Sequence, residues 1–261
     1  MTDTVLYSIA DGVATITLNR PQVMNALDLG MIQALRAAAE RCAGDASARA
    51  VVVRGNGPAF LAGGDVSVFR AHLPSLPQLV REGARELHHA IGALRRAPKP
   101  VLASVHGAVA GAGVSLLAAA DVAIAADDAK FTLAYSRIGT SPDGGATWAL
   151  PRLIGPRRAL ELMLLSDPVD ARTALQYGLV NWITDASRLA ADTAAIANRL
   201  ATGATLALAE TKRLVYEGQD SPLAAQLEAE AEAFARCAGT RDFAEGVAAF
   251  VEKRKPEFKG H

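Results

Sequence analysis

Apolar residues continue almost without interruption through residues 101–126, which makes this stretch the best candidate for the centre of a buried core. Its pattern predicts a buried strand at Val101–Val105, a turn of small residues at Gly107–Gly113, a short helix at about Ala112–Ala120 and a second strand at Val122–Ala125. The turn consists almost only of Gly, Ala and Val, so a ligand could approach its backbone closely. Tight packing of a helix on a strand would require the same small residues.

Strand-like alternation and helical spacing recur on both sides of this stretch. Alternation predicts a strand at Val13–Leu18, a buried run predicts another at Ala50–Val53, and helical spacing predicts a helix that begins after Asp28. Residues 67–78 contain two prolines and are expected to form a mobile loop. Strands are also expected at Phe131–Leu133 and Leu179–Ile183, and helices at Leu79–Arg96, Pro156–Leu165, Asp170–Tyr177, Ala186–Ala201, Leu206–Glu217, Pro222–Cys237 and Asp242–Arg254.

The predicted elements divide the chain into two parts. Strands and helices alternate over the first two-thirds, which indicates an α/β fold, whereas the last quarter is helical throughout. We therefore expect a core at residues 1–200 that holds the functional site, followed by a helical region at residues 201–261.

Composition excludes several classes of function. Lys and Arg number 27 and Asp and Glu also number 27, so the net charge is zero, which argues against nucleic acid or an anionic membrane as the main partner. Cys42 and Cys237 show neither metal-binding nor redox spacing. The first residues lack a basic segment followed by an apolar run, so we expect a cytoplasmic protein.

Three features together suggest chemistry at a carbonyl group. A Gly63-Gly64 turn follows a strand, Gly111-Ala112-Gly113 begins a helix, and Asp143 lies in a loop rich in Pro and Gly. Two backbone N–H donors from two loops are what an oxyanion hole needs, and an acid beside them could move a proton next to the activated carbonyl. Alternatively, Asp143 only forms a turn by bonding to its own backbone.

The order of short motifs along nearly the whole chain resembles the crotonase family, the enoyl-CoA hydratase/isomerase superfamily. The matching stretches are Leu18–Pro21 with Asn25–Leu27, Phe60–Asp65, Pro100–Val105 with Gly107 and Ala110–Gly113, Ala120-Asp121, Ala129–Phe131, Gly139–Gly145 and Phe250–Arg254. The resemblance implies a crotonase-type spiral of ββα units, with an all-helical C-terminal region that forms trimers or dimers of trimers. It also implies acyl-CoA thioester substrates and an enolate-like intermediate. Coenzyme A then enters as part of the substrate, and neither a permanently bound cofactor nor a metal is expected.

The resemblance also implies particular catalytic residues. The oxyanion hole falls on the backbone N–H groups of Gly64 and Ala112. Family hydratases carry two Glu residues at the positions of Ser115 and Tyr135, and neither of these can replace a carboxylate base near neutral pH. Family isomerases often place their acid at the position of Asp143. We therefore expect an enoyl-CoA isomerase in which Asp143 takes a proton from C2 of a 3-enoyl-CoA and returns it at C4.

The same resemblance implies contacts with coenzyme A. Val23 and Met24 would flank the pantetheine, and Ala62 would contact the ligand through its backbone. Phe250 and Lys253 are expected to reach the nucleotide, in many relatives across a subunit boundary. Alternatively, Lys253 belongs to a solvated helix end, where the helix dipole favours cations.

Other functions are compatible with these residues. A hydratase could use Asp143 and a water held by Ser115 or Tyr135. An aryl-CoA dehalogenase branch of the family has an Asp matching Asp143 and a His matching about His88, and a thioesterase-like reaction is related to it. A non-catalytic acyl-CoA binder would keep the oxyanion hole without turnover. Asp65 either binds substrate or caps the helix that follows it.

Overall fold

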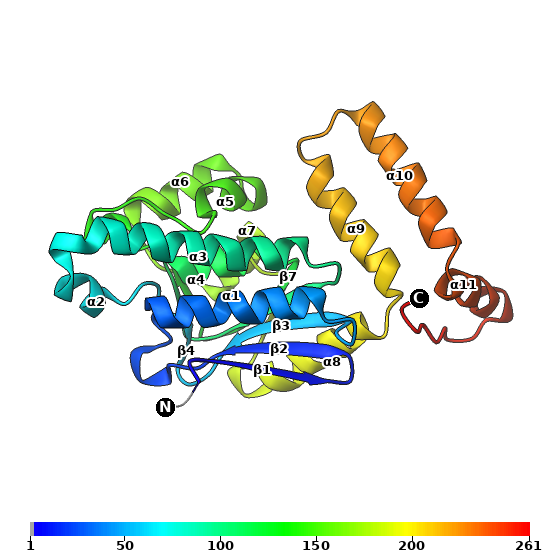
Figure 1. Cartoon of the computed structure of the whole chain (residues 1–261), viewed down its shortest axis with the longest axis horizontal. Coiled ribbons are helices and arrows are strands. Elements are labelled where there is room, and N and C mark those ends of the chain that lie inside the picture. Colours follow the sequence, from blue (N-terminus) through cyan, green and yellow to red (C-terminus); the bar gives the residue numbers. More distant parts are fainter. Residues whose placement is uncertain (1–2) are drawn as a thin grey trace.

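The computed structural model describes residues 3–261. Its centre is a six-stranded sheet with the strand order β1-β2-β3-β5-β7-β10, of which Figure 1 labels β1, β2, β3 and β7. Its first two strands form an antiparallel hairpin, and every other neighbouring pair is parallel. The strands are β1 (Val5–Ala10), β2 (Val13–Leu18), β3 (Ala50–Gly55), β5 (Val101–Val105), β7 (Val122–Ala126) and β10 (Trp182–Thr184).

A second, four-stranded sheet follows the order β4-β6-β8-β9. Its strands are β4 (Ala59–Leu61), β6 (Ala108–Ala110), β8 (Lys130–Thr132) and β9 (Val169–Asp170). Strands β3, β5 and β7 of the large sheet are each followed within a few residues by a strand of the small sheet. This repeated step, with helices between the repeats, confirms the predicted α/β spiral of ββα units.

The strand register gives the large sheet two apolar faces. Ile16 pairs with Val53, Val53 with Ala103 and Ala103 with Ala123, and this row belongs to the main buried core. The neighbouring row, including Val52 and Leu102, packs on helix α8 on the other face. Because side chains alternate along a strand, both faces of this central sheet must be covered.

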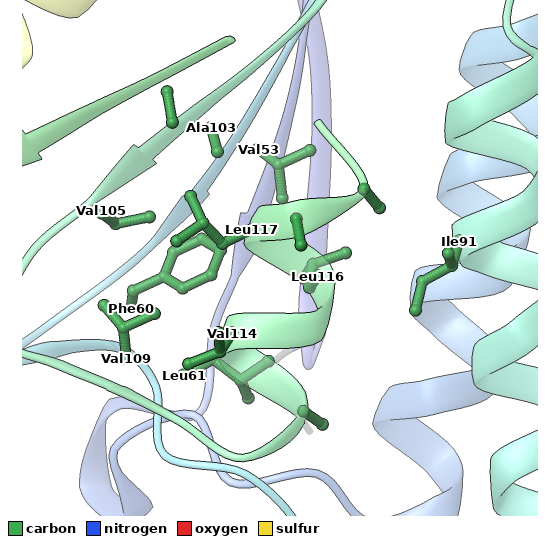
Figure 2. Close-up of a cluster of buried hydrophobic side chains, with 14 of the residues drawn as sticks. Val53, Phe60, Leu61, Ile91, Ala103, Val105, Val109, Val114, Leu116 and Leu117 are labelled. Atoms are coloured by element: carbon green, nitrogen blue, oxygen red, sulfur yellow. The ribbon is translucent and has the colours of Figure 1, made fainter. Parts of the chain in front are cut away.

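Helices α1 (Leu29–Gly44), α3 (Leu76–Arg96) and α4 (Ala112–Ala118) cover the first face, and α8 (Leu189–Ala201) covers the second. Figure 2 shows α4 between the strands and α3, with Ile91 of α3 facing it. All seven residues of α4 are buried, as the continuous apolar run predicts. The N-terminus of α4 is therefore held rigidly.

Residues 67–78 are largely helical, so the prediction of a mobile loop is wrong. They contain most of α2 (Val66–Ala71), a 3₁₀ helix (Leu73–Ser75) and the start of α3. Both prolines lie in first turns, Pro74 in the 3₁₀ helix and Pro77 in α3. A proline is tolerated there because the N–H group that it lacks would have no intrahelical partner.

Most of the other differences concern short elements. Strand β6 lies inside the predicted turn at residues 107–113, β4 and β9 were not expected, and the strand predicted at Leu179–Ile183 is found at Trp182–Thr184. A strand of two or three residues has too few positions to show alternation. The six-residue strand β1 was also not expected, although the exposure of its residues alternates along the chain. The helices predicted from Pro156 onward correspond to α6 (Pro156–Leu165), α7 (Ala171–Tyr177), α8 and the three C-terminal helices, and α5 (Ala146–Ile154) precedes them.

The C-terminal region consists of α9 (Thr205–Gly218), α10 (Leu223–Ala238) and α11 (Arg241–Glu252), and α10 and α11 project away from the core (Figure 1). Polar contacts hold α9 on the core: the Nζ of Lys212 lies 2.9 Å from one carboxylate oxygen of Asp121, and the Tyr216 hydroxyl donates to the other at 2.5 Å. Burial lowers the pKa of Lys212, and Asp121 opposes this effect. Within residues 3–261, no helix has the length and apolar character needed to cross a bilayer.

Candidate active site

A cavity of about 650 Å³ opens between α2, α3 and the loops that follow the strands of the small sheet. Its wall is mostly apolar and includes Ile32, Phe69, Leu73, Leu76, Leu79 and Leu87. The same wall includes Gly64, Ala112, Tyr135 and Asp143, and a Cβ atom on Gly64 would lie 2.7 Å from Cζ of Phe69. The cavity thus combines an apolar lining with the residues that the sequence predicts to be catalytic.

Two glycine turns bring the backbones of two loops against each other in this wall. Gly63 has φ +97° and Gly111 has φ +51°, a region that residues with a side chain rarely adopt. A Cβ atom on Gly111 would lie 3.5 Å from the Cα of Gly63, and one on Gly63 would lie 3.3 Å from the carbonyl oxygen of Ala110. The residues that follow, Gly64 and Ala112, are therefore held close together.

The amide groups of Gly64 and Ala112 are available to a ligand. Leu27 donates to the carbonyl oxygen of Gly63 at 2.8 Å and accepts from the N–H of Asp65 at 2.9 Å, so this bridge does not use the N–H of Gly64. Ala112 is the first residue of α4, where an N–H has no intrahelical partner. Within residues 3–261 neither amide donates a hydrogen bond.

Asp143 reaches the cavity with its carboxylate already oriented. The hydroxyl of Tyr135 donates to Oδ1 of Asp143 at 2.6 Å, and the Ser115 hydroxyl donates to the backbone carbonyl of the same residue at 2.8 Å. In the described part of the chain Asp143 forms no ion pair with Lys, Arg or His. The carboxylate thus lines the cavity without an ion-pair partner among the described residues.

The ring of Tyr135 connects Asp143 with the two amides. A Cβ atom on Gly111 would lie 3.8 Å from Cζ of Tyr135, so the ring packs beside the start of α4. Burial raises the pKa of the Tyr135 phenol well above its usual value, and the charge of Asp143 raises it further. The phenol therefore keeps its proton at physiological pH and serves as a donor to Asp143.

His88 is an exposed residue of α3 that contacts the loop carrying Asp143. Its Nε2 accepts a hydrogen bond from the N–H of Gly144 at 3.2 Å. Among the described residues that line the cavity there is no histidine. The geometry therefore gives no support to a dehalogenase-like reaction in which His88 would act on the substrate.

The residues expected to contact coenzyme A are only partly brought together. Ala62 lines the cavity, and because its N–H donates to the carbonyl of Met24 at 3.0 Å, its carbonyl oxygen is the group left for a ligand. Met24 is half exposed and follows Val23 at the end of a short 3₁₀ helix (Pro21–Val23). Phe250 and Lys253 lie at the end of α11 and do not line the cavity of their own chain.

Asp65 caps α2, which is the structural alternative that the sequence left open. Its carboxylate accepts from the N–H and the hydroxyl of Ser67 and forms a 3.2 Å ion pair with Arg20. These contacts, the Ser67 hydroxyl first, lower the pKa of Asp65. Arg20, which also pairs with Asp28 at 3.1 Å, was not singled out from the sequence, although it lies within the Leu18–Pro21 motif.

Comparison with known proteins agrees with this geometry. Residues 8–261 match the family model described as enoyl-CoA hydratase/isomerase. The chain belongs to the enoyl-CoA hydratase/isomerase family. A solved structure of a putative enoyl-CoA hydratase/isomerase from Mycobacterium abscessus has a TM-score of 0.95 at 39% identity, covering 98% of this chain and 100% of that one. The resemblance to the crotonase family and its fold is thus confirmed.

Curated relatives of this hydratase/isomerase-family enzyme carry names of both activities. A probable enoyl-CoA hydratase from Rhodobacter capsulatus is 42% identical, with 98% of each chain covered. A trans-2-decenoyl-(acyl-carrier-protein) isomerase from Streptococcus mutans is 36% identical over 98% of each chain, and a 1,2-epoxyphenylacetyl-CoA isomerase from Escherichia coli is 35% identical over 100% of each. The family acts on CoA thioesters, and within residues 3–261 no group of three His, Cys, Asp or Glu side chains is placed to bind a metal.

Proposed function

We propose that this protein is an enoyl-CoA isomerase that moves a double bond from C3 to C2 of an acyl-CoA, with Asp143 as its proton shuttle. The observation that carries the proposal is the carboxylate of Asp143, which lines the same cavity as Gly64 and Ala112 and forms no ion pair within residues 3–261. The other carboxylate on that wall, Asp28, caps α1 and pairs with Arg20. Asp143 is therefore the group suited to accept a proton.

The two carboxylate oxygens of Asp143 have different roles. Because Tyr135 donates to Oδ1, Oδ2 remains to take the C2 proton of a 3-enoyl-CoA. The electron pair left at C2 delocalises onto the thioester oxygen as a dienolate, and the amides of Gly64 and Ala112 stabilise that negative charge. Asp143 then returns the same proton at C4, so the double bond lies between C2 and C3 and no atom is gained or lost.

Water addition is less well supported by the same residues. Ser115 and Tyr135 occupy the two positions at which family hydratases are expected to carry Glu, and both hydroxyls donate to Asp143. One carboxylate remains where hydration would use two. Two of the relatives named above carry isomerase names, which also supports an isomerase activity.

A substrate comparison tests the proposal. The purified protein receives a 3-enoyl-CoA and, in a separate reaction, a 2-enoyl-CoA, and the products are separated by chromatography. We expect 2-enoyl-CoA from the first substrate. Formation of 3-hydroxyacyl-CoA from the second, with no reaction of the first, would show a hydratase instead.

Tyr135→Phe removes the hydrogen bond to Oδ1 and keeps the aromatic ring in the cavity wall. Because that hydrogen bond orients the carboxylate, its loss is expected to lower kcat/KM for a 3-enoyl-CoA by about 10-fold. The measurement is steady-state kcat/KM of wild type and variant with one 3-enoyl-CoA. An unchanged kcat/KM would show that the phenol does not act on Asp143.

We also propose that the C-terminal helices join the chain into a homotrimer, or a dimer of trimers. Helices α10 and α11 expose large apolar side chains, of which Phe250 is 85% and Val251 74% exposed. Such a patch on an isolated chain usually marks an interface. The expected CoA contacts of Phe250 and Lys253 would then be made with a neighbouring chain.

Phe250→Asp tests this assembly. A charge in the centre of an apolar interface is expected to convert the trimer to monomers at micromolar concentration, since a buried unpaired charge is strongly unfavourable. Sedimentation velocity of both proteins gives the state of assembly, and circular dichroism checks that the variant is folded. A variant that sediments like the wild type would place the interface elsewhere.

A further inference from the structure

One peptide group, between Asp143 and Gly144, is held by side chains from two different helices. Ser115 of α4 donates its hydroxyl proton to the carbonyl oxygen of this peptide at 2.8 Å. His88 of α3 accepts from its N–H at 3.2 Å. The N–H of Ala146 also donates to the same carbonyl, at 3.2 Å, as the loop turns into α5.

The local sequence explains why such a restraint is needed. Gly144 and Gly145 have φ values of +61° and +78°, and glycines reach many other conformations at little cost. A rotation of the peptide between Asp143 and Gly144 would turn the Asp143 side chain relative to the substrate. Because a misplacement of about 1 Å can cost about 100-fold in rate, the orientation of this peptide matters for catalysis.

The surroundings leave little room for another arrangement. A Cβ atom on Gly144 would lie 2.7 Å from Cβ of Ser115 and 3.3 Å from Cδ1 of Ile91. Ile91 lies three residues after His88 on α3, so both side chains lie on one face of the helix. That face and Ser115 in the middle of α4 contact the peptide from two sides.

We propose that His88 is a positioning residue for Asp143, which it orients by accepting from the N–H of Gly144 while Ser115 donates to the carbonyl of the same peptide. To accept, Nε2 carries the lone pair and Nδ1 carries the proton. The inference rests on the proposed function in one respect, that Asp143 is the proton shuttle. In this proposal Ser115, which occupies a position where family hydratases are expected to carry Glu, helps to hold the same peptide.

Three variants test the proposal. His88→Leu removes the acceptor, and we expect kcat for a 3-enoyl-CoA to fall about 10- to 100-fold with little change in KM. His88→Gln carries an amide oxygen that can accept from Gly144 and is expected to restore most of the loss. His89→Leu is the matched control, since His89 is an exposed neighbour on the same helix for which no hydrogen bond is found within residues 3–261.

Hydrogen–deuterium exchange provides a measurement that does not depend on activity. The peptide covering residues 141–146 is expected to exchange faster in His88→Leu than in the wild type, and at the wild-type rate in His89→Leu, because a freed N–H is less protected. Equal exchange and equal kcat in His88→Leu and wild type would overturn the positioning role. A lower kcat that His88→Gln does not restore would overturn it as well.

These outcomes are separate from those of the proposed function. If the wild type does not isomerise a 3-enoyl-CoA, the proposed reaction fails, while the exchange experiment still decides whether His88 restrains the peptide. If the wild type is active and Asp143→Asn is not, but His88→Leu matches the wild type in kcat and exchange, only the positioning role fails.

Discussion

Asp143→Asn is expected to lower kcat for isomerisation of a 3-enoyl-CoA by about 10²- to 10⁴-fold, the range found for the loss of a general acid–base group. Asn has nearly the same shape, and its amide oxygen can still accept from the hydroxyl of Tyr135. What it cannot do near neutral pH is accept and return a proton. The measurement is steady-state turnover of wild type and variant with one 3-enoyl-CoA.

Asp28→Asn is the matched control for this experiment. Asp28 also presents a carboxylate to the cavity, but its Oδ1 accepts from the N–H of Met31 at the start of α1, and Asn is an equally good residue at that position. We expect the control to keep most of its turnover. Titration with a saturated acyl-CoA should give similar affinities for all three proteins. Full activity of Asp143→Asn, or an equal loss in Asp28→Asn, would contradict the assignment.

The sequence could predict that Gly64, Ala112 and Asp143 line one cavity because their motifs lie next to buried elements. Gly63-Gly64 lies one residue after β4, and Ala112 begins α4, so their backbones are fixed by the core that the apolar pattern identifies. Parallel strands β4 and β6 are neighbours in the small sheet, which brings the two loops together. The loop with Asp143 follows β8, the next strand of that sheet.

What the sequence could not show is contact between distant segments. His88 and Gly144 are separated by 56 residues, and a histidine on a helix gives no signal of which backbone group it will meet. The helical conformation of residues 67–78 was missed because a proline in a first turn and a proline that ends a helix look alike without a side-chain cap. Neither helix that holds a proline has one, since the N-cap residues His72 and Ser75 form no capping hydrogen bond. Helix α2 is capped by Asp65, but its six residues are too few to show helical periodicity.

The buried polar contacts of α9 also join segments that are distant in the sequence. Lys212 was not singled out, since a single lysine on an amphipathic helix is usually solvated. In the structure its Nζ also donates to the carbonyl of Leu94 at 2.9 Å, beside its ion pair with Asp121. These partners come from α3 and from the segment before β7, so α9 is fixed to the elements that carry the site. The C-terminal region is thus joined to the core by specific contacts and not only by the chain.

Ala112→Pro is the second substitution from which we expect a very large effect. Proline has no N–H, so one of the two donors to the dienolate oxygen is lost, and the ring carbon that replaces the hydrogen occupies the same space. Loss of one oxyanion-hole donor typically lowers kcat about 10²- to 10³-fold. Proline is well suited to the first position of a helix, so α4 is expected to form, with thermal unfolding as the check.

Ala171→Pro provides the comparison that isolates the donor. Ala171 is also a buried alanine at the first position of a seven-residue helix, α7, but it does not line the cavity. If Ala112→Pro loses turnover and Ala171→Pro keeps it at similar stability, the loss belongs to the Ala112 amide. Asp143→Asn and Ala112→Pro would then be inactive for different reasons, because one lacks the base and the other lacks the stabilised dienolate. Exchange of the C2 proton of a saturated acyl-CoA with solvent should be lost in both, since forming the enolate requires the base and the oxyanion hole together.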